Sequence, residues 1–222
     1  MRLSRLVPLQ VRTTLYRALP PSLRPTPKSA PVPRVELEDR HLVNLRVVSN
    51  RRRLLELLPK GGIVAELGVA DGDFSVQILE FARPSRLHLI DAWHTPRFQS
   101  GLKRVEERFR EPIGTGAVQL HHGLSVEQLS KFADHYFDWI YIDTTHSYHL
   151  TAQELALGRL KVKPGGILAG HDYVTGNWDG GCRYGVVEAV NEFCGRHEWE
   201  FLYLTHETDR HLSFAIRAIS GR

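Results

Sequence analysis

Cysteine is scarce in this chain of 222 residues, which contains two, Cys182 and Cys194. Their spacing matches no zinc motif, and two cysteines do not build the disulfide framework of a small secreted protein. Long hydrophobic runs are absent as well, since no apolar stretch approaches the ~20 residues that a membrane-spanning helix requires. We therefore expect reduced thiols, a cytoplasmic location and no transmembrane segment.

Acidic residues are absent from residues 1–34, which carry seven arginines and lysines and seven of the twelve prolines. Proline excludes a regular helix from residues 20–33, and residues 1–35 are interpreted as a basic, weakly ordered extension of a folded domain over residues 36–222. Leucines and valines among the arginines of the extension also fit a basic amphipathic arm or a transit peptide, and these alternatives stay open.

The charge balance changes once this extension is set aside. The whole chain carries a net charge of +4, but residues 35–222 contain 22 basic and 25 acidic residues. A domain that binds nucleic acid is expected to be basic, so this balance argues against a nucleic-acid partner. One local run of three arginines, at residues 51–53, is interpreted as the solvated face of a helix.

Strand and helix patterns alternate along the folded part of the chain. Apolar runs predict strands over residues 63–67, 86–90, 117–121, 137–142 and 166–169, with helices over 74–81, 96–110, 126–133, 148–160 and 184–193. A helical spacing of leucines and valines precedes them over residues 42–58, and residues 199–204 and 212–216 are interpreted as a terminal hairpin. Repeated βα units imply an α/β fold with a Rossmann-like, doubly wound sheet, here of seven strands with a C-terminal antiparallel hairpin.

A third glycine is missing from the turn after the first of these strands. The turn has the form E-x-G-x-x-x-G, with Glu66, Gly68 and Gly72, and departs from the G-x-G-x-x-G of dinucleotide-binding proteins. Glycine lets a ligand approach the main chain closely, and the amides of the following helix favour a polar or anionic group. Glu66 at the strand end would repel a pyrophosphate and attract the ammonium group of an amino acid.

With this turn and the terminal hairpin, the chain resembles class I S-adenosylmethionine-dependent methyltransferases. Asp91 closes the second strand at the spacing where an acid accepts the ribose hydroxyls of a cofactor, or it caps the next turn. Trp93 covers the adenine, lines the substrate pocket or belongs to the core. The resemblance implies that the loop with His122, Gly123 and Ser125 borders the adenine, although Ser125 fits equally well as a helix N-cap.

Two aspartates follow neighbouring strands. Asp143 ends the fourth strand and opens a D-x-x-H motif with His146, and Asp172 follows the fifth strand in the sequence His171-Asp172-Tyr173. Because the carboxyl ends of parallel strands meet at one edge of a sheet, the two carboxylates are expected to converge. Converging carboxylates favour a shared proton, a positive group or a divalent metal with oxygen ligands.

This arrangement over residues 45–217 resembles the metal-dependent macrolide-sugar O-methyltransferases. The resemblance implies that Asp143, His171 and Asp172 hold a metal such as Mg²⁺ or Mn²⁺, and that His146 is the general base. His171 departs from the pattern, because the relatives carry an acid there and imidazole is a poor ligand for magnesium. Either the metal differs, or His171 acts from outside the ligand set, or no metal binds and a histidine works without one.

A glycine-rich loop over residues 175–186 precedes the last helix. In the resembled group a similar loop helps to close the pocket. We therefore consider Tyr173, Asn177, Trp178 and Arg183 as contacts to substrate, since an aromatic ring beside polar groups suits a sugar or another polyhydroxylated acceptor. A surface loop without such a role explains the same residues.

The favoured function is transfer of a methyl group from S-adenosyl-L-methionine to a hydroxyl of a small molecule or saccharide. Alternatives are an NAD-dependent oxidoreductase of Rossmann type and a cofactor-binding scaffold without catalysis. A nucleic-acid methyltransferase is disfavoured, because no Asn/Asp-Pro-Pro-Tyr-type tetrad follows the fourth strand. The acceptor, and whether the protein forms a homo-oligomer, are not determined by the sequence.

Overall fold

A computed structural model of the protein describes residues 32–96, 98–177, 181–207 and 211–219. The extension up to residue 31 and the candidate substrate contact Trp178 lie outside these residues. Within the described part of the chain, no helix is long and apolar enough to cross a membrane. Cys182 and Cys194 are both free thiols.

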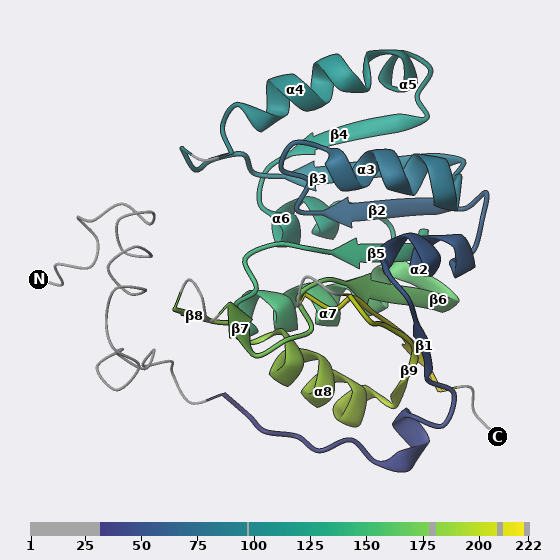
Figure 1. The fold of residues 1–222 in the computed structure, drawn as a ribbon. Coiled ribbons are helices and arrows are strands. Elements are labelled where there is room, and N and C mark those ends of the chain that lie inside the picture. The colour runs from purple at the N-terminus through teal and green to yellow at the C-terminus, as the bar shows by residue number, and fades with distance from the viewer. Residues whose placement is uncertain (1–31, 97, 178–180, 208–210, 220–222) are drawn as a thin grey trace, which may run out of the picture.

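One mixed sheet organises the domain, with the strand order β1-β9-β10-β6-β5-β2-β3-β4 (Figure 1). The central strands β2, β3, β4, β5 and β6 are parallel, β10 is antiparallel to β6 and β9, and β1 is parallel to β9. The strands are β1 Arg46–Val48, β2 Ile63–Leu67, β3 Arg86–Asp91, β4 Val118–His122, β5 Phe137–Ile142, β6 Val162–Gly170, β9 Trp199–Thr205 and β10 Phe214–Ala218. This topology confirms the predicted α/β fold and its C-terminal antiparallel hairpin.

Helices cover both faces of the sheet. Side chains of β5 alternate between two cores, because Trp139 and Tyr141 belong to one cluster and Ile140 and Ile142 to the other. The first core includes residues of α2, α3 and α4, and the second includes residues of α6, α7 and α8. The helical segments are η3 Asp39–His41, α2 Arg51–Leu57, α3 Asp73–Gln77, η4 Ile78–Ala82, α4 Gly101–Arg108, α5 Arg110–Gly114, α6 Ser125–Ser130, α7 Tyr148–Lys161 and α8 Val186–His197.

Three predicted elements differ from the structure, the first being the helix expected over 74–81, which is divided into α3 and the π-helical segment η4. The helix expected over residues 42–58 is wrong, because strand β1 and the short helix α2 occupy this segment. β1 pairs with β9 and becomes an eighth, edge strand of the sheet, where Val47 is 64% exposed and Val48 is buried. The helix expected over 96–110 is divided into α4 and α5. A short ribbon of β7 Gly176–Asn177 and β8 Cys182–Arg183 forms part of the glycine-rich loop.

Candidate active site

The carboxyl ends of β2, β5 and β6 meet at one edge of the sheet, on the left in Figure 1. Backbone hydrogen bonds extend the pairing of these strands past their ends. The Asp143 amide donates to the Leu67 carbonyl over 2.8 Å, and the His171 amide donates to the Ile142 carbonyl over 3.0 Å. The side chains that follow β5 and β6 are thereby brought to the glycine turn after β2.

Asp143, His146, His171 and Asp172 form the predicted cluster at this edge. His146 Nε2 lies 2.8 Å from Asp172 Oδ2 and 3.4 Å from Asp143 Oδ1. His171 Nδ1 lies 3.2 Å from Asp172 Oδ2 and 3.6 Å from Asp143 Oδ2. The Ser147 side chain, and not that of His146, caps α7 by accepting a hydrogen bond from the Leu150 amide.

These contacts set the protonation of the cluster. Burial opposes a charged imidazole, but hydrogen bonds to Asp143 and Asp172 raise the pKa of His146 to about 9. Burial likewise opposes a charged Asp172, but hydrogen bonds from His146 and His171 hold the pKa of this carboxyl well below its usual range. His146 therefore carries a proton at neutral pH in this arrangement. It can act as a base only after losing this proton, which requires the carboxylates to have a different positive partner.

The donor set suits a divalent transition metal. Ligand atoms of Asp143, His146 and Asp172 all lie within 4.8 Å of one another. His146 thus takes the place in this group that we expected for His171. The His171 Nε2 atom is buried and has no hydrogen-bond partner among the described residues. Mixed carboxylate and imidazole donors fit manganese, iron or zinc better than magnesium.

Three residues near the cluster were missed by the sequence analysis. Arg51 at the start of α2 places Nη1 3.6 Å from Asp143 Oδ2, although we expected the arginine run to be a solvated face. His211, which precedes β10, contacts Asp172 Oδ1 through Nδ1. The Tyr184 ring lies 4.6 Å from the His146 ring, between centroids. Apart from the arginine run, no local pattern marks these residues, because each contact joins distant parts of the chain.

Glu66 lies beneath the glycine turn rather than open to a ligand. Its side chain is 1% exposed and accepts a hydrogen bond of 2.5 Å from the Ser75 hydroxyl. Burial raises the pKa of Glu66 to about 8, against the effect of the Ser75 hydrogen bond. In this state the group is neutral at pH 7, so the attraction of an ammonium group that we expected requires Glu66 to lose its proton.

Replacing Glu66 by glutamine is expected to change how stability depends on pH. An unfolded chain releases this proton near pH 4.5, whereas the folded state keeps it up to about pH 8. Below pH 4.5 both states are protonated, and between these values the unfolding free energy of the wild type falls by up to about 1.4 kcal/mol per pH unit. Urea unfolding at pH 6 and pH 8 measures this effect. The unfolding free energy of the glutamine variant, relative to that of the wild type, should be higher at pH 8 than at pH 6.

A matched control for that experiment is Glu106→Gln on α4, whose side chain is exposed. This variant should follow the wild type at both pH values. Equal pH slopes for the Glu66 variant and the wild type would contradict a buried, protonated Glu66.

Asp91 and Trp93 hold the glycine turn in place. Asp91 Oδ2 accepts from the Val69 and Ala70 amides at 2.8 and 2.9 Å, and Oδ1 accepts from the Trp93 amide. The Trp93 indole donates to the Ala70 carbonyl over 2.7 Å and is 4% exposed. The described geometry thus agrees with the alternative of turn capping for Asp91 and a core position for Trp93, and contact with ribose or adenine stays a prediction.

The loop after β4 lies beside Asp91. The Gly123 amide donates to the Asp91 carbonyl over 2.9 Å, and His122 is exposed, with Nε2 2.9 Å from the Ala92 carbonyl. Ser125 is buried and donates to Glu154 over 2.5 Å. The N-cap alternative for Ser125 is wrong, because α6 starts at Ser125 and Leu124 occupies the cap position.

The predicted substrate contacts are partly engaged elsewhere. The Tyr173 hydroxyl donates to Asn191 over 2.6 Å, on α8, and Arg183 pairs with Glu188 over 2.5 Å. Asn177 pairs with Cys182 in the β7–β8 ribbon. The loop itself does reach the cluster, because the Gly185 amide donates to the His146 carbonyl over 2.8 Å. A substrate role for these residues stays a prediction.

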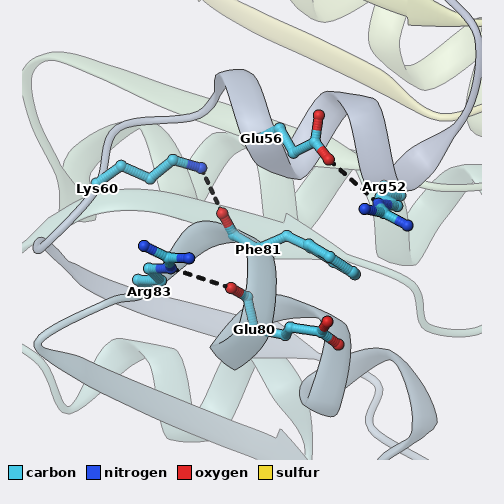
Figure 2. Close-up of a pocket in the computed structure, with 6 residues that line it drawn as sticks. All are labelled: Arg52, Glu56, Lys60, Glu80, Phe81 and Arg83. Atoms are coloured by element: carbon cyan, nitrogen blue, oxygen red, sulfur yellow. Dashed lines mark hydrogen bonds and ion pairs between the residues drawn. The ribbon is translucent and has the colours of Figure 1, made fainter.

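A hollow of about 440 Å³ lies away from this chemistry (Figure 2). Arg52, Glu56, Lys60, Glu80, Phe81 and Arg83 line it. Lys60 and Arg83 precede β2 and β3, so the hollow is near the amino ends of these strands, opposite the cluster. Its charges are already engaged: the Lys60 ammonium donates to the Leu55 and Phe81 carbonyls, and Arg52 pairs with Glu56. This hollow is therefore not the candidate active site.

Several solved structures share the fold. The pyocyanin biosynthetic protein PhzM matches with a TM-score of 0.59 and 13% identity over 76% of this chain, which spans 54% of that protein. The Bacillus subtilis m1A22 tRNA methyltransferase TrmK matches with a TM-score of 0.56 and 14% identity, over 78% of this chain and 67% of that one. An S-adenosylmethionine-dependent methyltransferase from Aquifex aeolicus matches with a TM-score of 0.55 and 13% identity. The match covers 77% of this chain and 95% of that one.

At this identity the structural matches show the fold and not the activity. No curated protein matches the chain in sequence. Residues 65–173, which run from strand β2 through the glycine turn and Asp143 to Tyr173, match a protein family described as "Methyltransferase domain". This segment, 109 of the 222 residues, is therefore similar to that methyltransferase domain, and the fold around it agrees with the match.

Proposed function

We propose that the protein transfers a methyl group from S-adenosyl-L-methionine to a hydroxyl of a small molecule or saccharide. One observation carries the proposal: an acid–histidine cluster of Asp143, His146 and Asp172 stands beside the Gly68 turn of a methyltransferase domain. The turn and the cluster touch, because a Cβ added at Gly68 would lie 1.9 Å from the Asp143 carbonyl oxygen. A donor bound along the turn would have its reactive group next to the cluster.

The chain's own residues supply what the reaction needs. A hydroxyl is a weak nucleophile at neutral pH, and it must lose its proton as it attacks the methyl carbon in line with the methyl–sulfur bond. His146 is placed to accept that proton, and Asp143 and Asp172 orient its imidazole. A divalent metal held by Asp143, Asp172 and His171 would lower the pKa of the hydroxyl and neutralise the carboxylates, with His146 outside the ligand set as the base.

The acceptor class rests on the loop that closes over His146. Tyr184 packs on the His146 ring, and the Gly185 amide binds the His146 carbonyl, so this loop forms one wall of the site. Aromatic and polar side chains together suit a polyhydroxylated ring. We also propose a cytoplasmic location and an acceptor that is not a nucleic acid.

Calorimetric titration with S-adenosylhomocysteine tests the cofactor, first after EDTA treatment and then with Mg²⁺ or Mn²⁺ added. Micromolar binding is expected, followed by metal-dependent methyl transfer in a screen of sugars and phenols. Binding of NADH in place of S-adenosylhomocysteine would overturn the proposal in favour of a Rossmann oxidoreductase. Cofactor binding with full activity after metal removal would overturn the role of the metal and leave a His146 mechanism.

A further inference from the structure

Three consecutive arginines open helix α2, and their side chains have different surroundings. Arg52 and Arg53 both pair with Glu56, at 3.1 and 2.9 Å, with half or more of each arginine side chain exposed. Figure 2 shows the Arg52–Glu56 pair at the rim of the hollow. Arg51 differs, because only 26% of its side chain is exposed and it points to the candidate active site. Arg51 is therefore placed to act in the site, whereas Arg52 and Arg53 are not.

The Arg51 guanidinium is held between an aromatic ring and a carboxylate. Its Cζ lies 4.7 Å from the centroid of the Phe74 ring, and Nη1 lies 3.6 Å from Asp143 Oδ2. The backbone is fixed as well, since the Arg51 amide donates to Glu207 over 2.7 Å. Stacking on Phe74 restrains a long side chain, so less conformational entropy is lost when the guanidinium binds a ligand.

The position of Arg51 is at the junction of the glycine turn and the cluster. Helix α3 begins directly after Gly72, and Phe74 is its second residue. Asp143 is the residue whose backbone lies against Gly68. Within the part of the chain that the structure describes, Arg51 is the one arginine or lysine in an ion pair with Asp143 or Asp172. Arg51 therefore brings a permanent positive charge to a site otherwise built from carboxylates and histidines.

We propose that Arg51 binds the α-carboxylate of the methionyl part of S-adenosylmethionine, an inference that rests on the proposed function. An amino-acid group is a zwitterion, with an ammonium and a carboxylate on one carbon. The Arg51–Asp143 pair presents the complementary charges side by side, 3.6 Å apart. On binding, the carboxylate pairs with Arg51 and the ammonium with Asp143, so that neither charge is left unpaired. Guanidinium is suited to this role because it binds a carboxylate through two parallel hydrogen bonds.

A consequence for ligand selection follows. Adenosine thioethers that lack the amino-acid part do not use Arg51, so their affinity should not depend on it. 5′-Methylthioadenosine is such a ligand, since it shares the nucleoside and the thioether with S-adenosylhomocysteine. The ratio of the two affinities therefore reports on the zwitterion site and is insensitive to changes in the nucleoside site.

The test compares both ligands by calorimetry on full-length wild type, Arg51→Gln and the matched control Arg53→Gln. We expect Arg51→Gln to weaken S-adenosylhomocysteine binding by about 10- to 100-fold, on the scale of hydrogen bonds to charged groups. Its affinity for 5′-methylthioadenosine should stay within about twofold of the wild type, as should both affinities of Arg53→Gln. The affinity of Arg51→Lys for S-adenosylhomocysteine should lie between those of the wild type and Arg51→Gln, because lysine keeps the charge and loses the paired hydrogen bonds.

Several results would overturn the inference. Unchanged S-adenosylhomocysteine affinity in Arg51→Gln would remove Arg51 from the ligand site while leaving the proposed function intact. An equal loss for both ligands would show a structural role for the side chain. If Arg51→Gln does not fold, Arg51→Lys decides, since a selective loss for S-adenosylhomocysteine supports the inference and an equal affinity rejects it. Wild-type protein that binds neither ligand would overturn the proposed function and this inference together.

Discussion

Replacing Asp172 by asparagine is expected to lower kcat by about 10²- to 10⁴-fold, the range that general acid–base groups contribute. The Asp172 carboxylate is 3% exposed and contacts His146, His171 and His211. The substitution removes the charge that orients His146 and one ligand of the proposed metal. Affinity for S-adenosylhomocysteine should change little, because Asp172 makes no contact with the glycine turn in the described interactions.

Asparagine is the suitable replacement because the backbone at Asp172 has a φ of +57°. Asparagine tolerates this left-handed conformation, whereas alanine would add strain to the loss of charge. Asp138→Asn is a matched control, since Asp138 lies near the start of β5 and pairs with Lys163 over 2.8 Å. Initial rates and thermal unfolding should show an active control and a folded, inactive Asp172 variant. Wild-type kcat in the Asp172 variant would exclude the cluster from catalysis.

Replacing Gly68 by alanine is expected to destabilise the domain by about 2–5 kcal/mol, the sum of a left-handed backbone penalty and overpacking. The backbone at Gly68 has a φ of +88°, and a Cβ there would lie 1.9 Å from the Asp143 carbonyl oxygen. Relief by backbone movement is restricted, because the Gly68 amide donates to Ile90 and the Asp143 amide donates to Leu67. The midpoint temperature of thermal unfolding should fall by roughly 10 °C.

Gly61→Ala separates the two causes. Gly61 has a φ of +68°, but a Cβ there would meet nothing within 4 Å. This variant should therefore show the backbone penalty, about 1–2 kcal/mol, without the clash. The difference between the two variants measures how tightly the glycine turn packs on the strand that carries Asp143. An equal loss of unfolding free energy in the two variants would mean that the close approach of Gly68 to Asp143 does not contribute to the effect of the substitution.

The central strands were predictable because they are buried on both faces. The apolar runs at 63–67 and 137–142 match β2 and β5 at both ends. Parallel strands covered by helices on both sides have continuous apolar sequences, which are a local signal. β1 has no such signal, since two of its three residues are exposed and its partner β9 is about 150 residues away.

Glu66 shows the limit of motif reasoning within the site itself. Its place at the end of β2 was predicted correctly, but its side chain is buried against Ser75. The direction of a side chain at a strand end depends on the helix that packs there, here α3, and the motif does not specify it. Ser125 is a similar case, since its hydroxyl binds Glu154 on α7 rather than the helix that it begins.

The sequence by itself determined the order of βα units, the glycine turn and the convergence of Asp143, His146, His171 and Asp172, because these follow from local patterns and from the geometry of parallel strands. The tertiary structure decided which further groups surround them. Arg51 reaches the cluster from helix α2 and His211 from the terminal hairpin, and the residues in contact are 92 and 39 positions apart in the sequence. Such contacts arise from packing between distant segments, which no local spacing encodes.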